Sequence, residues 1–243
     1  MPDEITKNKR RARTLVLVTS LPVLVVAVVL GLLLPAVVAG VFAGILVAGW
    51  AAFASIGGPS RAHRALGGRP ADPVTDARLV NLVDGLLGGA GVPTPTLLVL
   101  DDPAPNALSF GLDPRHATLA VTRGLLDTLD RIELEGVLAR ELARIKSHEI
   151  RPATVAVAVL TVVGSIGPVA DRVRRAATAS PSVAADASGV AITRYPPGLA
   201  AALDKLRGDV ATGSPATAHL WVEPPASLLH PPHEERIEAL REL

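Results

Sequence analysis

Two long uncharged runs dominate the hydrophobic pattern at the start of the chain. The first extends from Thr14 to Leu34, and the second extends from Ala36 to Ile56, directly after Pro35. Each run contains 21 residues, enough for a helix to cross a hydrocarbon layer about 30 Å thick. The pattern therefore predicts a transmembrane helical hairpin over residues 14–56 that is in contact with membrane lipid.

Basic side chains flank both outer ends of this hairpin. They are Lys7, Lys9, Arg10, Arg11 and Arg13 before the first run, and Arg61, Arg64 and Arg69 after the second. Since basic flanks stay on the cytoplasmic side, residues 1–13 are predicted to be a cytoplasmic N-terminus. We expect a multi-pass protein of the cell (plasma) membrane whose globular domain is cytoplasmic. A second span directly after the first argues against a cleaved signal peptide.

Gly40 and Gly44 stand four residues apart in the second run. Small residues at this spacing let two membrane helices approach closely. The chain contains 21 glycines, so the spacing can equally be incidental. Both interpretations stay open at this point.

Beyond the hairpin the pattern becomes that of a folded domain. Residues 57–74 are basic and punctuated by Gly and Pro, which is typical of a linker, and the domain is expected over residues 75–243. Apolar residues recur at helical spacing from Leu79 to Leu86. This pattern predicts a helix that stops at Gly88-Gly89.

Short strands and further helices follow in this domain. The β-rich runs lie at 96–100 and 117–121, and 106–111 between them is a third candidate strand. Helical patterns cover 123–130, 134–149, 182–206 and 234–243.

A third uncharged run covers residues 153–170, between Arg151 and Arg172. Its length permits a membrane span. A single crossing would place one of its two basic flanks on the wrong side of the membrane. We therefore expect this segment to pack on the domain or to lie at the membrane surface.

The composition excludes several classes of function. The net charge is only +1 and aromatic residues make up 2%, so neither a strong positive field nor stacking rings are available for nucleic acid. The chain has no cysteine, which excludes disulfides, thiolate metal sites and a cysteine nucleophile. The hydrophobic content of 49% fits a protein with a membrane anchor.

The stretch LEGVLARELARIKSHE at 134–149 has the outline of a zinc-protease helix. Such a helix carries His-Glu-x-x-His, in which two imidazoles one turn apart bind the metal. The same five places here read Arg140-Glu141-Leu142-Ala143-Arg144. The glutamate is present, and both histidines are replaced by arginine.

Four strings in order resemble the membrane-anchored zinc metalloproteases of the HtpX-like and CAAX-prenyl-protease type. They are PNALSFG at 105–111, the block at 121–149 that contains the helix above, Ala185-Asp186 with the following TRYPPGLAAALDKL, and HPPHEERIEAL at 230–240. The resemblance extends from about residue 92 to residue 243. It implies an α+β fold, a mainly helical zincin-like domain with a small β-sheet.

Carried over residue by residue, the resemblance assigns the metal positions to Arg140, Arg144 and Ser182 and the general base to Glu141. It gives Asp186 a supporting place behind the metal ligands. A guanidinium has no lone pair to offer and repels a divalent ion. We therefore predict no metal and no cofactor, although zinc serves the family.

Without a metal, Glu141 has no bound water to activate. It is expected to be idle as a base and to pair with Arg140 or Arg144. Asp186 is expected to accept a hydrogen bond from one of these arginines. That hypothesis predicts a short contact between a guanidinium group and the Asp186 carboxylate.

The resemblance also implies a place for substrate. Asn106, Ala107 and Leu108 correspond to the edge strand that pairs with an extended peptide. The transition-state residues of the family correspond to His230 and Arg236. The alternative for these two is a turn before a helix and a position on a solvated helix face.

Other histidines could rebuild a metal site only at new positions. His148 with Glu149 could ligate in principle, but no His-x-x-x-His spacing exists in the chain. The alternative for His148 is a solvated histidine at a helix end.

Three functions follow from these observations. The first is an inactive pseudoprotease that binds peptide or membrane-protein partners at the cytoplasmic membrane face. The second is an active zinc metalloendopeptidase of the gluzincin type, using displaced ligands in membrane protein quality control. The third is a purely structural membrane protein. No serine triad or phosphate-binding glycine loop offers another chemistry.

Overall fold

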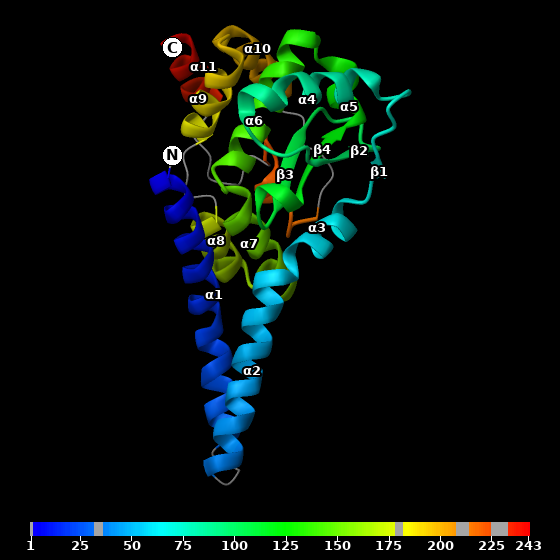
Figure 1. Ribbon diagram of the computed structural model, residues 1–243. Coiled ribbons are helices and arrows are strands. Elements are labelled where there is room, and N and C mark those ends of the chain that lie inside the picture. Colours follow the sequence, from blue (N-terminus) through cyan, green and yellow to red (C-terminus); the bar gives the residue numbers. More distant parts are fainter. Residues whose placement is uncertain (1, 32–35, 178–181, 208–213, 225–232) are drawn as a thin grey trace.

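The computed structural model describes residues 2–31, 36–177, 182–207, 214–224 and 233–243. A folded domain lies at one end of the molecule, and a long helical hairpin extends away from it (Figure 1). This arrangement confirms the predicted α+β fold, in which a mainly helical domain with a small sheet follows a helical hairpin.

The hairpin consists of α1 (Pro2–Gly31) and α2 (Ala36–Ile56). Both helices contain segments long and apolar enough to cross a membrane, Asp3–Val29 and Val38–Ile56. A Cβ atom added to Gly40 or Gly44 would meet no atom within 4 Å, so this glycine pair does not mediate close packing between the helices. The two helices are instead joined by a hydrogen bond of 3.2 Å from Trp50 Nε1 to Thr19 Oγ1.

The basic N-terminal residues form the first turns of α1, which lie beside the domain. Asn8 Nδ2 donates a hydrogen bond of 2.9 Å to the carbonyl of Ser147. The segment expected as a linker contains two regular elements, α3 (Gly58–Leu66) and the short strand β1 (Arg69–Pro70). Both ends of the hairpin are therefore attached to the domain through ordered elements.

Four strands form the sheet in the order β1-β2-β4-β3. They are β1, β2 (Thr96–Leu100), β3 (Ala107–Gly111) and β4 (Ala117–Thr122). β2 and β4 are parallel, and the other two pairs are antiparallel. All three predicted strands are present, and β3 ends the order as an edge strand of the sheet.

The first helix of the domain is longer than the sequence suggested. α4 (Ala77–Ala90) runs through Gly88-Gly89 and ends at Gly91, so the predicted stop is wrong. Gly91 has φ +64° and its N–H donates to Leu87 O, which is the left-handed C-cap that glycine favours. Gly88 and Gly89 have helical neighbours on both sides and need no special conformation.

Most of the remaining elements surround one central helix, α6 (Arg131–Lys146). Its side chains enter the main apolar core, which also contains residues of α4, the sheet and α10. The other elements are η1 (Pro114–His116), α5 (Arg123–Thr128), α9 (Ser182–Thr193), α10 (Pro196–Leu206), η2 (Ala218–Leu220) and α11 (His233–Arg241).

The third uncharged run forms parts of two helices, α7 (Ile150–Val163) and α8 (Gly167–Ala177). α7 is too short to count among the candidate spans, and most of it is buried against the domain and the hairpin. This segment therefore packs on the domain, which is the first of the two arrangements expected from the sequence. It lies where the hairpin meets the folded domain (Figure 1).

Candidate functional site

The central helix carries its charged residues into the interior. A capping box fixes the start of α6, because Asp130 accepts from the N–H of Glu133 while the Glu133 carboxylate accepts from the N–H of Asp130. Arg140, Glu141 and Arg144 lie in the last two turns of the helix, with only 2%, 0% and 8% of their surfaces exposed. Charged groups buried this deeply require partners.

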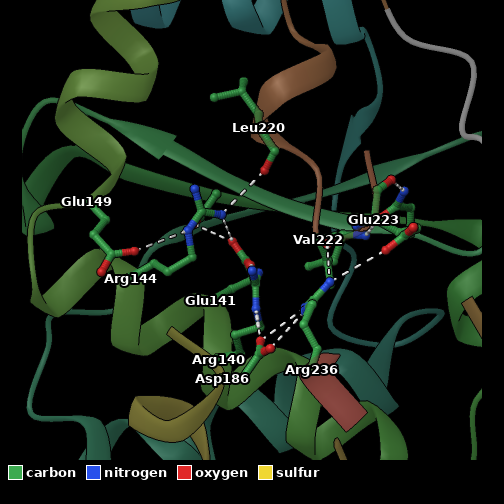
Figure 2. Close-up of polar contacts among 12 residues, drawn as sticks. Arg140, Glu141, Arg144, Glu149, Asp186, Leu220, Val222, Glu223 and Arg236 are labelled. Carbon is green, nitrogen blue, oxygen red and sulfur yellow. Dashed lines mark hydrogen bonds and ion pairs between the residues drawn. The ribbon is translucent and has the colours of Figure 1, made fainter. Parts of the chain in front are cut away.

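Glu141 is the centre of one half of the resulting network (Figure 2). Its Oε1 accepts a hydrogen bond from Arg140 Nη1, and its Oε2 accepts from Arg144 Nη1 at 2.8 Å. Ser109 Oγ on β3 donates to the same Oε2 at 2.5 Å. Glu141 thus pairs with both arginines, where the sequence left either one open.

Asp186 on α9 is the centre of the other half. Its Oδ1 accepts from Arg140 Nε at 2.6 Å, so the predicted short contact between arginine and aspartate is present. Arg236 on α11 forms a two-point contact with the same carboxylate, from Nε at 2.8 Å and from Nη2 at 3.0 Å. Burial alone would raise the pKa of Asp186, but Arg140 and Arg236 outweigh it and hold that pKa below the usual range.

A glycine allows α9 to bring Asp186 this close. Gly189 lies one turn after Asp186 and faces α6, and a Cβ atom at this position would lie 2.6 Å from the Cα of Arg140. Any larger residue would therefore push the two helices apart. The distance between Asp186 and Arg140 depends on this close approach.

Arg236 is buried, which contradicts one of the two alternatives considered for it from the sequence. A position on a solvated helix face was considered for it, yet only 1% of its surface is exposed. Besides Asp186, its Nη1 contacts the carbonyl oxygen of Val222 at 3.2 Å and the carboxylate of Glu223 at 3.5 Å. Arg236 therefore belongs to the buried network, as the peptide-cleft interpretation would require.

Glu149 and Glu223 add two more carboxylates to the network. Three guanidinium groups (Arg140, Arg144, Arg236) face four carboxylates (Glu141, Asp186, Glu149, Glu223). Glu149 lies 3.8 Å from Arg144 Nε, and burial raises its pKa although Arg144 and Arg140 oppose the rise. We call these seven residues the arginine cluster.

The donor set does not fit a zinc ion. The guanidinium groups offer no lone pair, and both oxygens of Glu141 already accept from arginine. Among the described residues, no three His, Cys, Asp or Glu side chains are grouped as metal ligands. Ser182 begins α9, but its side chain and the whole of His230 lie outside the described residues.

The two described histidines of the domain interior do not supply ligands. His148 lies just after the end of α6, as the alternative interpretation had it, but it is half-buried, has φ +60°, and its Nδ1 is buried without a hydrogen-bond partner. His219 is buried, and its Nε2 lies 2.8 Å from the carbonyl oxygen of Ala153. Burial lowers the pKa of His219 to about 4, so the ring is neutral at pH 7.

The predicted peptide-binding strand is covered by a segment of the same chain. Val222 N donates to Ala107 O at 2.8 Å, and Leu108 forms an antiparallel bridge with Trp221. The Asn106 side chain donates to Glu223 O at 2.6 Å and accepts from Glu223 N at 3.1 Å. We call residues 220–223 the resident strand, because they lead from the last residue of η2 into an extended segment beside β3.

The arginine cluster and Asn106 together bind carbonyl groups of the resident strand. Arg144 contacts Leu220 O at 3.3 Å, Arg236 contacts Val222 O at 3.2 Å, and Asn106 contacts Glu223 O at 2.6 Å. The arginines thus hold the backbone of this segment beside β3, and Figure 2 shows the contacts of Arg144 with Leu220 and of Arg236 with Val222. The sequence alone did not reveal Ser109 or the resident strand, because their contacts join segments far apart in the chain. Glu149 was considered there only as a ligand beside His148.

In a comparison with known protein families, residues 73–243 match the sequence pattern of Peptidase family M48. A "Protease HtpX homolog" from Tropheryma whipplei (strain Twist) is 36% identical over 213 residues, which cover 68% of this chain and 72% of that protein. One from Dictyoglomus thermophilum is 36% identical over 209 residues, covering 67% and 68%. One from Thermococcus kodakarensis is 34% identical over 221 residues, covering 72% and 76%.

Proposed function

Because the chain belongs to peptidase family M48, we propose that it is a membrane-anchored pseudoprotease, in which the arginine cluster stands where the family binds zinc. The observation that carries the proposal is the pairing of Arg140 and Arg144 with Glu141 and Asp186 at distances of 2.5–2.8 Å. Guanidinium groups cannot ligate a metal, and here they also engage the carboxylates that remain. The chain's own residues therefore fill the catalytic cleft with a structural network.

The state of Glu141 supports an inactive cleft. A general base needs a free lone pair within reach of the proton that it abstracts. Both oxygens of Glu141 instead accept hydrogen bonds from arginine, and Oε2 also accepts from Ser109. To act as a base, this carboxylate would have to break contacts that compensate two buried positive charges.

The remaining function of the cleft is to bind extended chain. Contacts from Asn106, Arg144 and Arg236 reach backbone carbonyls, which every peptide has. A peptide or a loop of a membrane protein would add to β3 in place of the resident strand. The basic flanks of the hairpin favour a cytoplasmic location for the domain, at the inner face of the cell membrane.

Metal analysis of the purified full-length protein tests the first half of the proposal. We expect less than about 0.1 zinc per chain for the natural sequence, since none of the three family positions supplies a ligand. The variant Arg140→His/Arg144→His/Ser182→Glu restores the three ligand types and should bind about one zinc per chain. The restored variant is the control that shows the domain can accept a metal under the conditions used.

An active metallopeptidase would give a different result. The natural sequence would then contain stoichiometric zinc, and Glu141→Gln would abolish a peptidase activity measured on unfolded casein. That outcome would replace the pseudoprotease with an enzyme that uses displaced ligands.

Hydrogen exchange tests the second half. A synthetic peptide with the sequence of residues 218–224, AHLWVEP, should bind by strand exchange and alter the protection of β3 amides, whereas the reversed sequence should not. Asn106→Ala should weaken this effect, because it removes two hydrogen bonds to the peptide backbone. Unchanged exchange with all peptides would favour a purely structural protein.

A further inference from the structure

A second cavity lies away from the arginine cluster, where the hairpin joins the domain. It has a volume of about 260 Å³ and is formed by α1, α2 and α7. Its lining consists of Ala12, Arg13, Val16, Leu17, Ser55, Arg151 and Val155. The cavity thus combines two guanidinium groups and one hydroxyl with an apolar wall.

The cavity lies at the level where the hairpin leaves the membrane. Arg13 is the last charged residue before the uncharged run of α1, and Ser55 is the penultimate residue of α2. Below it, the surface of α1 is apolar and exposed, with Leu17 at 71% and Leu21 at 61% of their surfaces accessible. The polar part of the cavity is therefore continuous with a surface that hydrocarbon chains would cover.

The two arginines of this cavity are unlike those of the arginine cluster. Ion pairs between described residues involve nine other basic residues, including Arg140, Arg144 and Arg236, but neither Arg13 nor Arg151. Their hydrogen-bond donors remain available to a ligand on the open side of the cavity.

The surroundings of the cavity are positive. Arg13 and Arg151 are the charged residues among the described residues that line it, and that lining contains no carboxylate. The local field therefore favours an anion.

We propose that this cavity binds an anionic phospholipid, with Arg13 and Arg151 donating to its phosphate group and Ser55 contacting its polar headgroup. Arginine suits phosphate because its planar fork matches the phosphate oxygens. The apolar wall of Val16, Leu17 and Val155 receives the first part of an acyl chain, which free phosphate lacks. The site goes beyond the proposed pseudoprotease function and is independent of it.

Native mass spectrometry of the full-length protein in a non-ionic detergent tests the site. Phosphatidylglycerol, phosphatidylcholine of the same chain length and inorganic phosphate are titrated separately. We expect phosphatidylglycerol to bind at least about tenfold more tightly than either of the others, because only it combines a net negative charge with acyl chains.

Two double variants with the same net charge separate the cavity from general attraction. Arg13→Gln/Arg151→Gln should weaken phosphatidylglycerol binding about 25-fold, since about 1 kcal/mol for each arginine corresponds to about fivefold. The control Arg10→Gln/Arg64→Gln removes two exposed arginines outside the cavity and should change binding by less than about threefold. Arg13→Lys/Arg151→Lys keeps the charge but loses the planar fork, so it should weaken binding, although less than the glutamine pair does.

The proposal is overturned by any of three results. Equal weakening in the cavity and control variants would mean general surface attraction. Equal affinity for phosphatidylcholine would mean that the charge is not recognised. Equal affinity for inorganic phosphate would mean that the acyl chain has no place in the site. An unchanged thermal midpoint of each variant without lipid shows that folding is intact.

Discussion

The two sides of α6 are both buried, but one is stabilised by apolar contacts and the other by ion pairs. Leu134, Leu138 and Leu142 enter the apolar core on one side. Arg140 and Arg144 on another side are matched by carboxylates from α6 and α9. Apolar contacts are many and individually weak, whereas each buried charge depends on a few partners at short distance. The charged side should therefore be the more sensitive to a single substitution.

Asp186→Ala should have the largest effect on stability. The substitution leaves Arg140 and Arg236 without their shared carboxylate, each being at most 2% exposed. Loss of one partner of a buried ion pair lowers the free energy of unfolding by about 3–5 kcal/mol. Urea unfolding of the protein in detergent, followed by far-UV circular dichroism, measures this change. A loss below about 1 kcal/mol would show that the network contributes little.

Leu138→Ala tests the apolar side of the same helix. Leu138 is fully buried, and removing its side chain should lower the free energy of unfolding by about 3 kcal/mol through lost burial and the cavity left behind. The same unfolding measurement applies. A loss larger than that of Asp186→Ala would reverse the comparison and make the apolar side dominant.

Local patterns in the sequence predicted most elements of the fold. The uncharged runs predicted the two long helices, and the β-rich runs at 96–100 and 117–121 predicted strands close to their observed places. These features depend on residues close together in the chain. The end of α4 was missed because Gly88-Gly89 resembles a stop, whereas the left-handed residue that ends the helix is Gly91.

The site was less accessible from the sequence, because its contacts are not local. Arg140 and Glu141 could be placed on one helix, and the pairing of Asp186 with Arg140 followed from the family resemblance. Arg236 contacts Asp186, roughly 50 positions away, and Val222 pairs with Ala107, roughly 115 positions away. No periodicity in the sequence indicates contacts between such distant residues. The roles assigned to Ser182 and His230 stay predictions, because their side chains lie outside the described residues.

His219 sharpens the comparison, because it is a buried titratable group with no opposite charge beside it. Its folded pKa of about 4 lies below the ordinary value of 6.5, so the unfolded chain binds the proton more readily. Its contribution to stability is present above pH 6.5 and is lost as the pH falls. The free energy of unfolding should decrease by about 2 kcal/mol between pH 7 and pH 5.

The variant His219→Gln isolates this effect. Glutamine keeps an amide donor for the carbonyl of Ala153 but does not titrate. The difference between the natural chain and the variant should therefore change with pH in this range. Parallel stability curves from pH 7 to pH 5 would contradict the assignment to His219.

Asp204→Ala should have the smallest effect and is the matched control for Asp186→Ala. Asp204 also lies on a helix and contacts an arginine, Arg207, but at 3.8 Å and with 71% of its side chain exposed. Water solvates both groups after the substitution, so the free energy of unfolding should change by less than about 0.5 kcal/mol. If Asp204→Ala and Asp186→Ala destabilised the protein equally, the number of ion pairs rather than their burial would govern stability. In that case the contacts of Asp186 with Arg140 and Arg236 would not stabilise the packing of α6, α9 and α11.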